Sequence, residues 1–371
     1  MPPVPHAVKL AVLDDYLDTG RKHFEPIVKS SNGHLEMTVF QDTLPSFTHP
    51  ATPAHAKQEL IDRLKPFTII STMRERTPFP PELLNSLPNL KLLLTTGMRN
   101  ASIDLAAAKG RGVTVAGTEH PKITDSRKSG SYPGSDTTAQ HAWALILGIT
   151  RGIARDDAVV KNGGWQSDLA TGLDGKSLAL LGLGRIGAAV AKIGKSAFGM
   201  NIIAWSSSLT QETADERARD AGLPVEDKDG QKTFEVVSKE ELFSNADILS
   251  VQYVLSDRSR GIVAAKDLVR MKPSAFLVNT SRGPLVDEDA LLGVLQKGGI
   301  AGAALDVYNI EPLPKDSPWR TTAWGQNGSS DVILSPHMGY VERNNINGWY
   351  AQTAKNVQLF LEGKDLVNRM N

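Results

Sequence analysis

The chain contains no cysteine among its 371 residues, which excludes disulfides, thiolate nucleophiles and zinc sites built on sulfur. It also lacks any run of about 18 apolar residues and any charged-then-apolar leader at its start, so we expect a soluble, cytoplasmic protein. A net charge is absent too, because 41 basic residues balance 41 acidic ones. Without a field that attracts nucleic acid or anionic lipid, the expected partner is a small molecule, with no nucleic acid and no membrane.

The most informative segment lies near the middle of the chain, where an apolar run meets three spaced glycines. Residues 178–181 have the pattern of a buried parallel strand, and Gly182, Gly184 and Gly187 follow it. A second apolar run, 200–205, completes a βαβ unit. In such a unit the first glycine permits the tight turn, the second lets the backbone approach a pyrophosphate, and the third lets the helix pack on the strand. The segment therefore predicts a dinucleotide site at a helix N-terminus.

Roughly half of the chain precedes these glycines, so a separate domain is expected there. Apolar runs alternate with helix candidates through it, which predicts a parallel α/β sheet. The predicted strands are residues 8–13, 35–40, 68–71, 90–95 and 113–116, and the predicted helices are residues 57–64, 80–86 and 104–109. Two longer apolar helices, 137–149 and 346–361, bracket the nucleotide segment.

The composition changes to Pro, Lys, Ser and Gly over residues 119–135, which is typical of a linker or a surface insertion. The simplest organisation has a substrate domain at residues 1–118 and 341–371 and a nucleotide-binding domain at 136–340. The predicted fold class is α/β, with two doubly wound parallel-sheet domains: a Rossmann dinucleotide-binding domain inserted into a flavodoxin-like substrate domain.

Three polar residues follow predicted strands after the glycine turn: Arg282, Glu311 and His337. Each alone has an ordinary structural explanation, as a loop cation, a surface carboxylate or a packed histidine. Together they fit one reaction, because a guanidinium can grip a substrate carboxylate and an imidazole can protonate the oxygen that becomes negative as hydride arrives. A neighbouring carboxylate would orient that ring. The set predicts reduction of a 2-keto acid, with the same histidine acting as base in reverse.

Four motifs lie in these regions: Gly182-Leu-Gly-Arg-Ile-Gly187, Val278-Asn-Thr-Ser-Arg-Gly-Pro-Leu-Val-Asp287, Ala301-Gly-Ala-Ala-Leu-Asp-Val307 with Glu311-Pro312, and Ser335-Pro-His337. Together they resemble the D-isomer-specific 2-hydroxyacid dehydrogenase family, and the similarity covers most of the chain. The resemblance implies an oxidoreductase that transfers a hydride between NAD(P)H and the 2-keto carbon of a small 2-oxo acid. The product would be a D-2-hydroxy acid, and the reaction would be reversible.

The resemblance also implies roles for individual residues. His337 would be the general acid/base, Glu311 its carboxylate partner and Arg282 the substrate-orienting cation. The substrate carboxylate would also meet main-chain N–H groups of Gly97, Met98 and Arg99, although a plain strand-to-helix connection explains that loop equally well. The expected cofactor-binding residues are Gly182, Gly184, Arg185, Ile186, Gly187, Ser206, Ser207, Thr280, Asp306 and Gly339, with Asp306 at the nicotinamide carboxamide and no metal ion.

Several side chains near these motifs are expected to be structural or solvated. His141 is expected to be a packed helix residue rather than a catalytic one. Arg74 and Arg76 are expected to be solvated charges more than parts of the substrate site.

The choice of cofactor depends on the end of the strand at 200–205. A NAD-selective domain places an acid about twenty residues after the glycines to bind the ribose hydroxyls. Here Ser206 stands in that position, so no carboxylate repels a 2′-phosphate, and no adjoining arginine attracts one. The prediction is NAD(P)(H), with NADP(H) slightly favoured over NAD(H).

Other possibilities stay open. A nucleotide-sensing, corepressor-like scaffold that keeps the dehydrogenase fold is the alternative from another class of function. The substrate could be glyoxylate, hydroxypyruvate, pyruvate or a bulkier 2-oxo acid. Family resemblance implies a homodimer through the nucleotide domain, with the helix from Thr137 as a contact, but burial inside the monomer explains that helix nearly as well.

Overall fold

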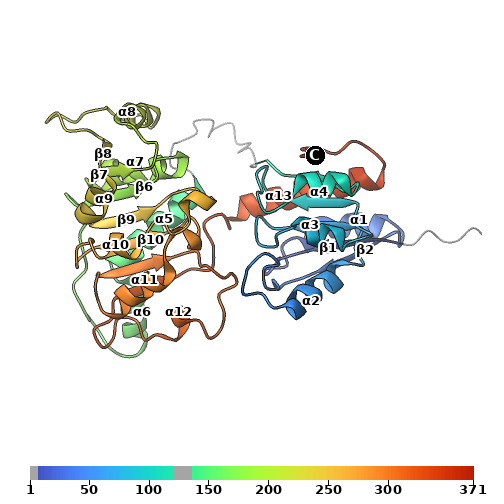
Figure 1. Cartoon of the computed structure of the whole chain (residues 1–371), viewed down its shortest axis with the longest axis horizontal. Helices are drawn as coiled ribbons and strands as arrows, with labels where there is room; N and C mark the ends of the chain where they lie inside the picture. Colours follow the sequence, from blue (N-terminus) through green and yellow to red (C-terminus); the bar gives the residue numbers. More distant parts are fainter. Residues whose placement is uncertain (1–6, 120–135) are drawn as a thin grey trace, which may run out of the picture. The chain divides into compact units, whose positions relative to one another are not determined.

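The computed structural model describes residues 7–119 and 136–371, so the predicted linker lies outside the described residues except for Glu119. These residues form two compact units, each built on a parallel sheet (Figure 1). Unit 1 contains the described residues up to Glu119 together with Ile310–Pro312 and Glu342–Asn371. Unit 2 contains the described residues from Asp136 to Asn309 and Leu313–Val341.

The sheet of unit 1 has five parallel strands in the order β2-β1-β3-β4-β5. This is the flavodoxin-like order, and it confirms the predicted fold class for this unit. The strands are β1 (Val8–Val12), β2 (Leu35–Val39), β3 (Ile69–Thr72), β4 (Leu92–Thr95) and β5 (Thr114–Ala116). All residues of β3 and β4 are buried, as expected of strands covered on both faces.

The described residues of unit 1 form the helices α1 (Arg21–Ser30), α2 (Ala54–Leu64), α3 (Pro81–Asn85), α4 (Leu105–Gly110) and α13 (Arg343–Leu361). The last of these comes from the C-terminal end of the chain and packs against α1 and β4. Its Trp349 and Tyr350 are almost fully buried, and the Tyr350 ring meets the Phe24 ring edge-on at 6.2 Å. Unit 1 therefore completes its core with residues separated from β1 by more than 300 positions.

The sheet of unit 2 has seven parallel strands in the order β12-β11-β10-β9-β6-β7-β8. Six of them follow the Rossmann order, with β6 first in sequence and β12 added at one edge, which confirms the predicted class for this unit. The strands are β6 (Ser177–Leu181), β7 (Asn201–Trp205), β8 (Glu235–Val236), β9 (Ile248–Val251), β10 (Phe276–Asn279), β11 (Gly302–Leu305) and β12 (Asp331–Leu334).

Helices cover this sheet above and below, and two separate apolar clusters form its core. The helical segments are α5 (Thr137–Thr150), α6 (Ile153–Lys161), α7 (Arg185–Phe198), α8 (Gln211–Asp220), α9 (Lys239–Asn245), α10 (Ala265–Leu268), α11 (Glu288–Gln296), α12 (Pro318–Thr321) and the 3-10 turns η2 (Asp257–Ser259) and η3 (Gly283–Leu285). No helix in the described parts of the chain is long and apolar enough to cross a membrane.

Helix α5 is buried inside unit 2. It packs against α7 and the strands β10, β11 and β12, and its Trp143 ring stacks on Phe198 at 4.7 Å. The Trp143 indole also donates to the Val190 carbonyl oxygen at 3.2 Å. The apolar face of this helix is thus explained by the monomer's own core, so the apolar pattern gives no separate support for a contact between two copies at this helix.

Candidate functional site

The glycine turn after β6 has the geometry that its sequence predicts. Gly182 has φ +99°, and a Cβ there would lie 2.6 Å from the Gln252 carbonyl oxygen. A Cβ on Gly187 would lie 2.2 Å from the Gly182 carbonyl oxygen, so the helix approaches the turn too closely for any side chain. A Cβ on Gly184 would meet nothing within 4 Å, so the backbone is open there.

Helix α7 begins at this turn, and its first N–H groups have no partner within the helix. Its N-cap, Gly184, provides no side-chain cap, and the first bond in the helix runs from the Ala188 N–H to the Gly184 carbonyl oxygen at 2.8 Å. The N–H groups of Arg185, Ile186 and Gly187 precede that bond and therefore point out of the helix end. Such an end attracts anions, so this turn fits the pyrophosphate of a dinucleotide. The side chain of Arg185 itself pairs with Asp136.

At the end of β7 the two serines have different surroundings. Ser207 contacts the Tyr253 hydroxyl through its N–H at 3.2 Å and its Oγ at 2.9 Å. Tyr253 in turn stacks on Trp205 at 6.4 Å. The Lys239 ammonium lies 5.9 Å from the centroid of the Trp205 ring and pairs with the Asp267 carboxylate at 2.6 Å. Ser206 is half-buried, with its carbonyl oxygen accepting from Leu209 at 3.3 Å.

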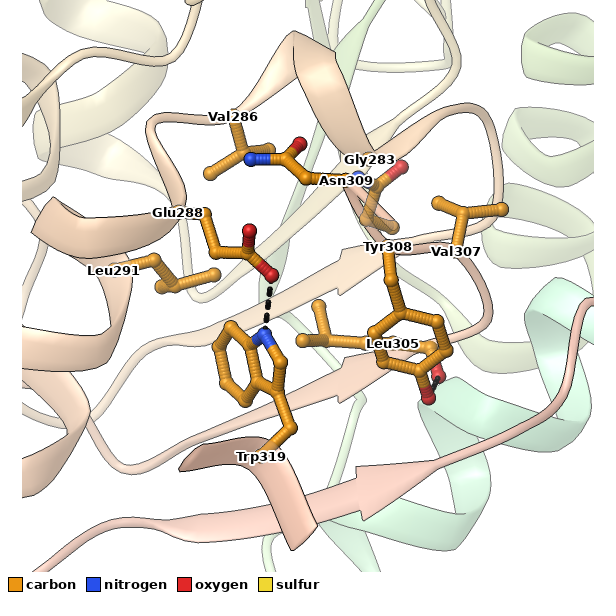
Figure 2. Close-up of a pocket in the computed structure, with 10 residues that line it drawn as sticks. Gly283, Val286, Glu288, Leu291, Leu305, Val307, Tyr308, Asn309 and Trp319 are labelled. Atoms are coloured by element: carbon orange, nitrogen blue, oxygen red, sulfur yellow. Dashed lines mark hydrogen bonds between the residues drawn. The ribbon is translucent and has the colours of Figure 1, made fainter. Parts of the chain in front are cut away.

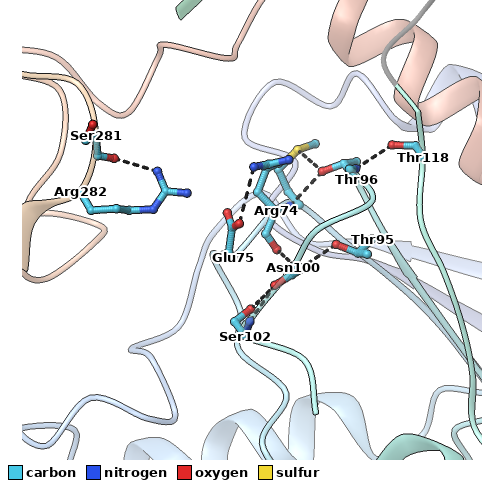
Figure 3. Close-up of polar contacts among 11 residues, drawn as sticks. Arg74, Glu75, Thr95, Thr96, Asn100, Ser102, Thr118, Ser281 and Arg282 are labelled. Carbon is cyan, nitrogen blue, oxygen red and sulfur yellow. Dashed lines mark hydrogen bonds and ion pairs between the residues drawn. The ribbon is translucent and has the colours of Figure 1, made fainter. Parts of the chain in front are cut away.

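The loop after β10 is fixed by hydrogen bonds of its own residues. The Asn279 side chain donates to the Arg282 carbonyl oxygen at 3.1 Å and accepts from the Ser281 N–H at 3.0 Å. The Arg282 guanidinium donates to the Ser281 carbonyl oxygen at 2.7 Å, as Figure 3 shows. Thr280 accepts from the Gln252 amide at 3.0 Å, which ties this loop to the one after β9.

Asp306 follows β11 and is fully buried. Its Oδ1 accepts from the Met338 N–H at 2.8 Å, and its Oδ2 accepts from the Gly339 N–H at 2.9 Å. Burial alone would raise the pKa of Asp306, but hydrogen bonds from His141, Ser335 and the Met338 N–H hold that pKa below its ordinary value. The Asp306 carboxylate is therefore ionised at neutral pH, and it accepts hydrogen bonds from the two residues that follow His337.

His337 follows β12 in a left-handed backbone conformation, with φ +57°. This region costs an L-residue free energy and persists only where the surroundings impose it. The imidazole meets the Tyr340 ring edge-on, with centroids 5.5 Å apart. The Asp306 carboxylate holds the two residues that follow His337, Met338 and Gly339, by accepting from their N–H groups.

Strand register brings several predicted residues to one edge of the sheet. Asn279, Leu305 and Leu334 are aligned partners at the ends of β10, β11 and β12. Arg282, Asp306 and His337 therefore leave the sheet at its carboxyl edge, and the glycine turn after β6 leaves it at the same edge. Glu311 lies in the segment Ile310–Pro312 that packs with unit 1, so its pairing with His337 stays a prediction.

The predicted substrate loop after β4 is tightly bonded. The Gly97 N–H donates to Thr118 Oγ1 at 2.8 Å, so the predicted main-chain contact with a substrate rests on Met98 and Arg99. The buried Asn100 side chain donates to the Arg74 carbonyl oxygen at 2.7 Å and to Thr95 Oγ1 at 2.9 Å (Figure 3).

Arg74 is not the solvated charge that we expected. Its side chain is 25% exposed and pairs with Glu75 at 3.5 Å. A Cβ on Gly97 would lie 2.2 Å from Arg74 Nη1, and the guanidinium carbon lies 6.0 Å from the Trp349 ring. Arg76 likewise lies over the Tyr16 ring at 5.1 Å. Both cations lie near aromatic rings, and Gly97 has a φ of +90°, in the left-handed region that favours glycine.

Sequence reasoning missed the environment of His141. Instead of packing passively in α5, its Nε2 lies 3.0 Å from Asp306 Oδ1 and 3.0 Å from Ser335 Oγ. The available signal was a polar ring on an otherwise apolar helix. A buried carboxylate, Asp14, follows the first strand and was not among the expected site residues.

A small cavity lies within unit 2, and Gly283 is one of the residues that line it (Figure 2). Apolar side chains line it together with Glu288, whose carboxylate accepts from the Trp319 indole at 2.6 Å. Its volume of about 20 Å³ holds one water molecule rather than a substrate. In residues 7–119 and 136–371, no group of three or more His, Asp or Glu side chains is arranged to hold a metal ion.

A Rossmann sheet that ends in a glycine cradle is the architecture of a dinucleotide-dependent oxidoreductase. Comparison with known proteins agrees: the family described as "D-isomer specific 2-hydroxyacid dehydrogenase, NAD binding domain" matches residues 143–339. Glyoxylate reductase of Thermococcus litoralis is 33% identical over 301 residues, which covers 78% of this chain and 80% of that protein. D-3-phosphoglycerate dehydrogenase of Bacillus subtilis is 30% identical over 347 residues, covering 92% of this chain and 58% of that protein.

Among solved structures, phosphoglycerate oxidoreductase of Vibrio cholerae O395 has a TM-score of 0.75 and 32% identity, and the match covers 96% of this chain and 99% of that one. The chain belongs to the D-isomer-specific 2-hydroxyacid dehydrogenase family. Its predicted family and fold class are thereby confirmed. Membership makes it a 2-hydroxyacid dehydrogenase that uses a nicotinamide dinucleotide.

Proposed function

We propose that the protein reduces a small 2-oxo acid to the D-2-hydroxy acid and catalyses the reverse oxidation. The observation that carries this proposal is the edge of unit 2, where Arg282, Asp306 and His337 leave three neighbouring strands beside the glycine cradle. Glyoxylate and hydroxypyruvate are the first candidate substrates, because relatives carry the names glyoxylate reductase and hydroxypyruvate reductase.

Each of these residues has a different role in the reaction. Arg282 grips the substrate carboxylate with its planar fork and polarises the adjacent carbonyl. His337 donates a proton to the carbonyl oxygen, and Glu311 orients its ring and favours the charged form. When bound, the nicotinamide supplies the hydride. Asp306 holds the His337 loop through Met338 and Gly339, and its contact with the carboxamide stays a prediction.

We assign the cofactor to the domain at residues 136–340 and substrate binding to residues 1–118 and 341–371. The remaining cofactor contacts are assigned to Gly182, Gly184, Arg185, Ile186, Gly187, Ser206, Ser207, Thr280 and Gly339. Ser206 leaves NADP(H) slightly favoured over NAD(H), since no acid at the end of β7 repels a 2′-phosphate.

We also propose a homodimer through unit 2, at the surface formed by residues 153–169. Helix α6 has no buried residue, and four large apolar side chains are exposed on this segment. They are Ile153 at 61%, Val160 at 52%, Trp165 at 75% and Leu169 at 92% exposure. Large apolar side chains exposed close together in the sequence are typical of an interface, and a second copy of this chain is the proposed occupant.

The catalytic assignment is tested by steady-state oxidation of NADPH and NADH against a panel of 2-oxo acids. His337→Ala should lower kcat by about 10²–10⁴-fold, the usual contribution of a positioned acid or base, while dinucleotide affinity is kept. His34→Ala, an exposed histidine in unit 1, is the matched control and should behave as wild type.

Two results would contradict the proposed function. Wild-type turnover in the His337→Ala enzyme would show that this imidazole does not carry the proton. Dinucleotide binding with no consumption of any 2-oxo acid would favour the corepressor-like scaffold instead.

A further inference from the structure

Helix α5 brings one polar ring to the carboxyl edge of the unit 2 sheet. His141 lies near the start of this helix, which Asp136 caps by accepting from the Thr138 N–H at 2.9 Å. The His141 side chain is 22% exposed, and its Nε2 lies 3.0 Å from both Asp306 Oδ1 and Ser335 Oγ. His141 Nε2 thus contacts one side chain after β11, Asp306, and one after the neighbouring strand β12, Ser335.

The two groups that His141 contacts hold the His337 loop from opposite sides. Ser335 precedes His337, and its N–H donates to the Leu305 carbonyl oxygen at 2.8 Å. The Ser335 carbonyl oxygen accepts from the Tyr308 hydroxyl at 3.0 Å. On the other side, the Asp306 carboxylate accepts from the N–H groups of the two residues after His337. His141 joins these two attachments into one network.

The protonation of the network follows from Asp306. Because its pKa is held below the ordinary value, the carboxylate is ionised and can only accept hydrogen bonds. His141 therefore carries its proton on Nε2 and donates toward Asp306, while the nearby Ser335 hydroxyl is a second donor. A side chain without a donor at this point would leave a buried, charged oxygen with one partner fewer, which weakens its hold on the loop.

We propose that His141 is a positioning residue for catalysis: it clamps Ser335 and Asp306 together, and so holds the left-handed loop in which His337 presents its imidazole. This inference rests on the proposed function, because it assigns His337 the proton transfer. It adds that the helix before the glycine turn sets the position of the acid/base.

The test compares His141→Leu, which removes the donor, with His141→Gln, whose amide can donate to Asp306 and accept from Ser335. Gln140→Leu, an exposed neighbour on the same helix, is the matched control. Rates are measured with the 2-oxo acid that wild type reduces fastest. The Leu variant should lose about 10–100-fold in kcat, the range expected when a reacting group is displaced by about 1 Å.

Several readouts separate positioning from a general loss of structure. In the Leu variant, thermal stability should stay close to wild type, and the solvent isotope effect on kcat should rise because protonation becomes slower. The Gln variant should recover most of the rate and the wild-type isotope effect. Ser335→Ala, which removes the other contact of Nε2, should lower kcat in the same direction.

Wild-type kcat in both His141→Leu and Ser335→Ala, alongside an inactive His337→Ala, overturns this inference and leaves the proposed function standing. An active His337→Ala overturns the proposed function itself. If His141→Leu does not fold, the Gln and Ser335→Ala variants decide: full loss in the Gln variant, or no loss in Ser335→Ala, contradicts the clamp.

Discussion

Replacing Asp14 by Asn should make unit 1 more stable at neutral pH. The Asp14 side chain follows β1 and is 4% exposed. It accepts from the Thr43 hydroxyl at 2.5 Å and from the Thr77 hydroxyl at 3.0 Å. Burial raises the pKa of Asp14 from 3.8 to about 6, despite those hydrogen bonds and the nearby charge of Arg76. Asn keeps an acceptor for the hydroxyls and tolerates the left-handed backbone at this position, where φ is +59°.

The direction of this pH effect on stability follows from which state, folded or unfolded, binds the Asp14 proton more tightly. The folded chain binds it up to a pH of about 6, whereas the unfolded chain releases it near 3.8. Protonation therefore favours folding, and stability is lost as pH rises through that window. At about 1.4 kcal/mol for each unit of pKa, the loss reaches about 3 kcal/mol by pH 7. Because Asn does not ionise, Asp14→Asn should avoid this loss.

The assay is peptide-level hydrogen exchange across a urea series, read on β1 and β3 so that it reports unit 1 alone. Wild type should become less protected between about pH 4 and pH 7, and Asp14→Asn should not. Asp62→Asn, an exposed carboxylate on α2, is the control and should follow wild type. Parallel pH dependence in wild type and Asp14→Asn would refute the reasoning, because the buried carboxyl would then not titrate in this window.

Other changes give equally direct outcomes. Arg282→Lys should lower kcat/KM for 2-oxo acids, with a loss of transition-state stabilisation of about 1.5–3 kcal/mol, because an ammonium does not reproduce the planar fork. Unchanged kinetics would show that Arg282 does not bind the substrate. Ser206→Asp should shift preference toward NADH, measured as the ratio of kcat/KM for the two cofactors, because the carboxylate binds ribose hydroxyls and repels a 2′-phosphate. Trp165→Ser with Leu169→Ser should convert the proposed dimer to monomer in light scattering, and an unchanged mass would contradict the surface at 153–169.

Much of the fold was predictable because apolar runs and turn residues act locally. The predicted strand at 178–181 differs from β6 by one residue, and the five predicted strands of unit 1 match β1 to β5. Helix α1 was missed, since Pro26 lies inside it and most of its surface is polar. The start of α2 was placed three residues late, because the signal there is Pro53 rather than a side-chain cap.

The site was only partly predictable, and the missing parts involve distant segments. Arg282 and His337 stand out because they follow apolar runs. The contact between His141 and Asp306 joins positions 165 residues apart, and no local pattern fixes it. The packing of Arg74 against Gly97 also depends on Trp349, which arrives from the far end of the chain. Tertiary packing decides such contacts, so a local spacing rule does not reach them.

The discontinuity of unit 1 has a consequence for how the protein is made. Domains generally fold in the order in which the ribosome releases them, but β1 to β5 emerge long before the helix that covers them. Until Trp349, Tyr350 and Val357 leave the ribosome, β4 and α1 lack the apolar partner that they have in the finished protein. The later-encoded unit 2 can therefore assemble first, and the part of the polypeptide synthesised earliest is the last to acquire its native core.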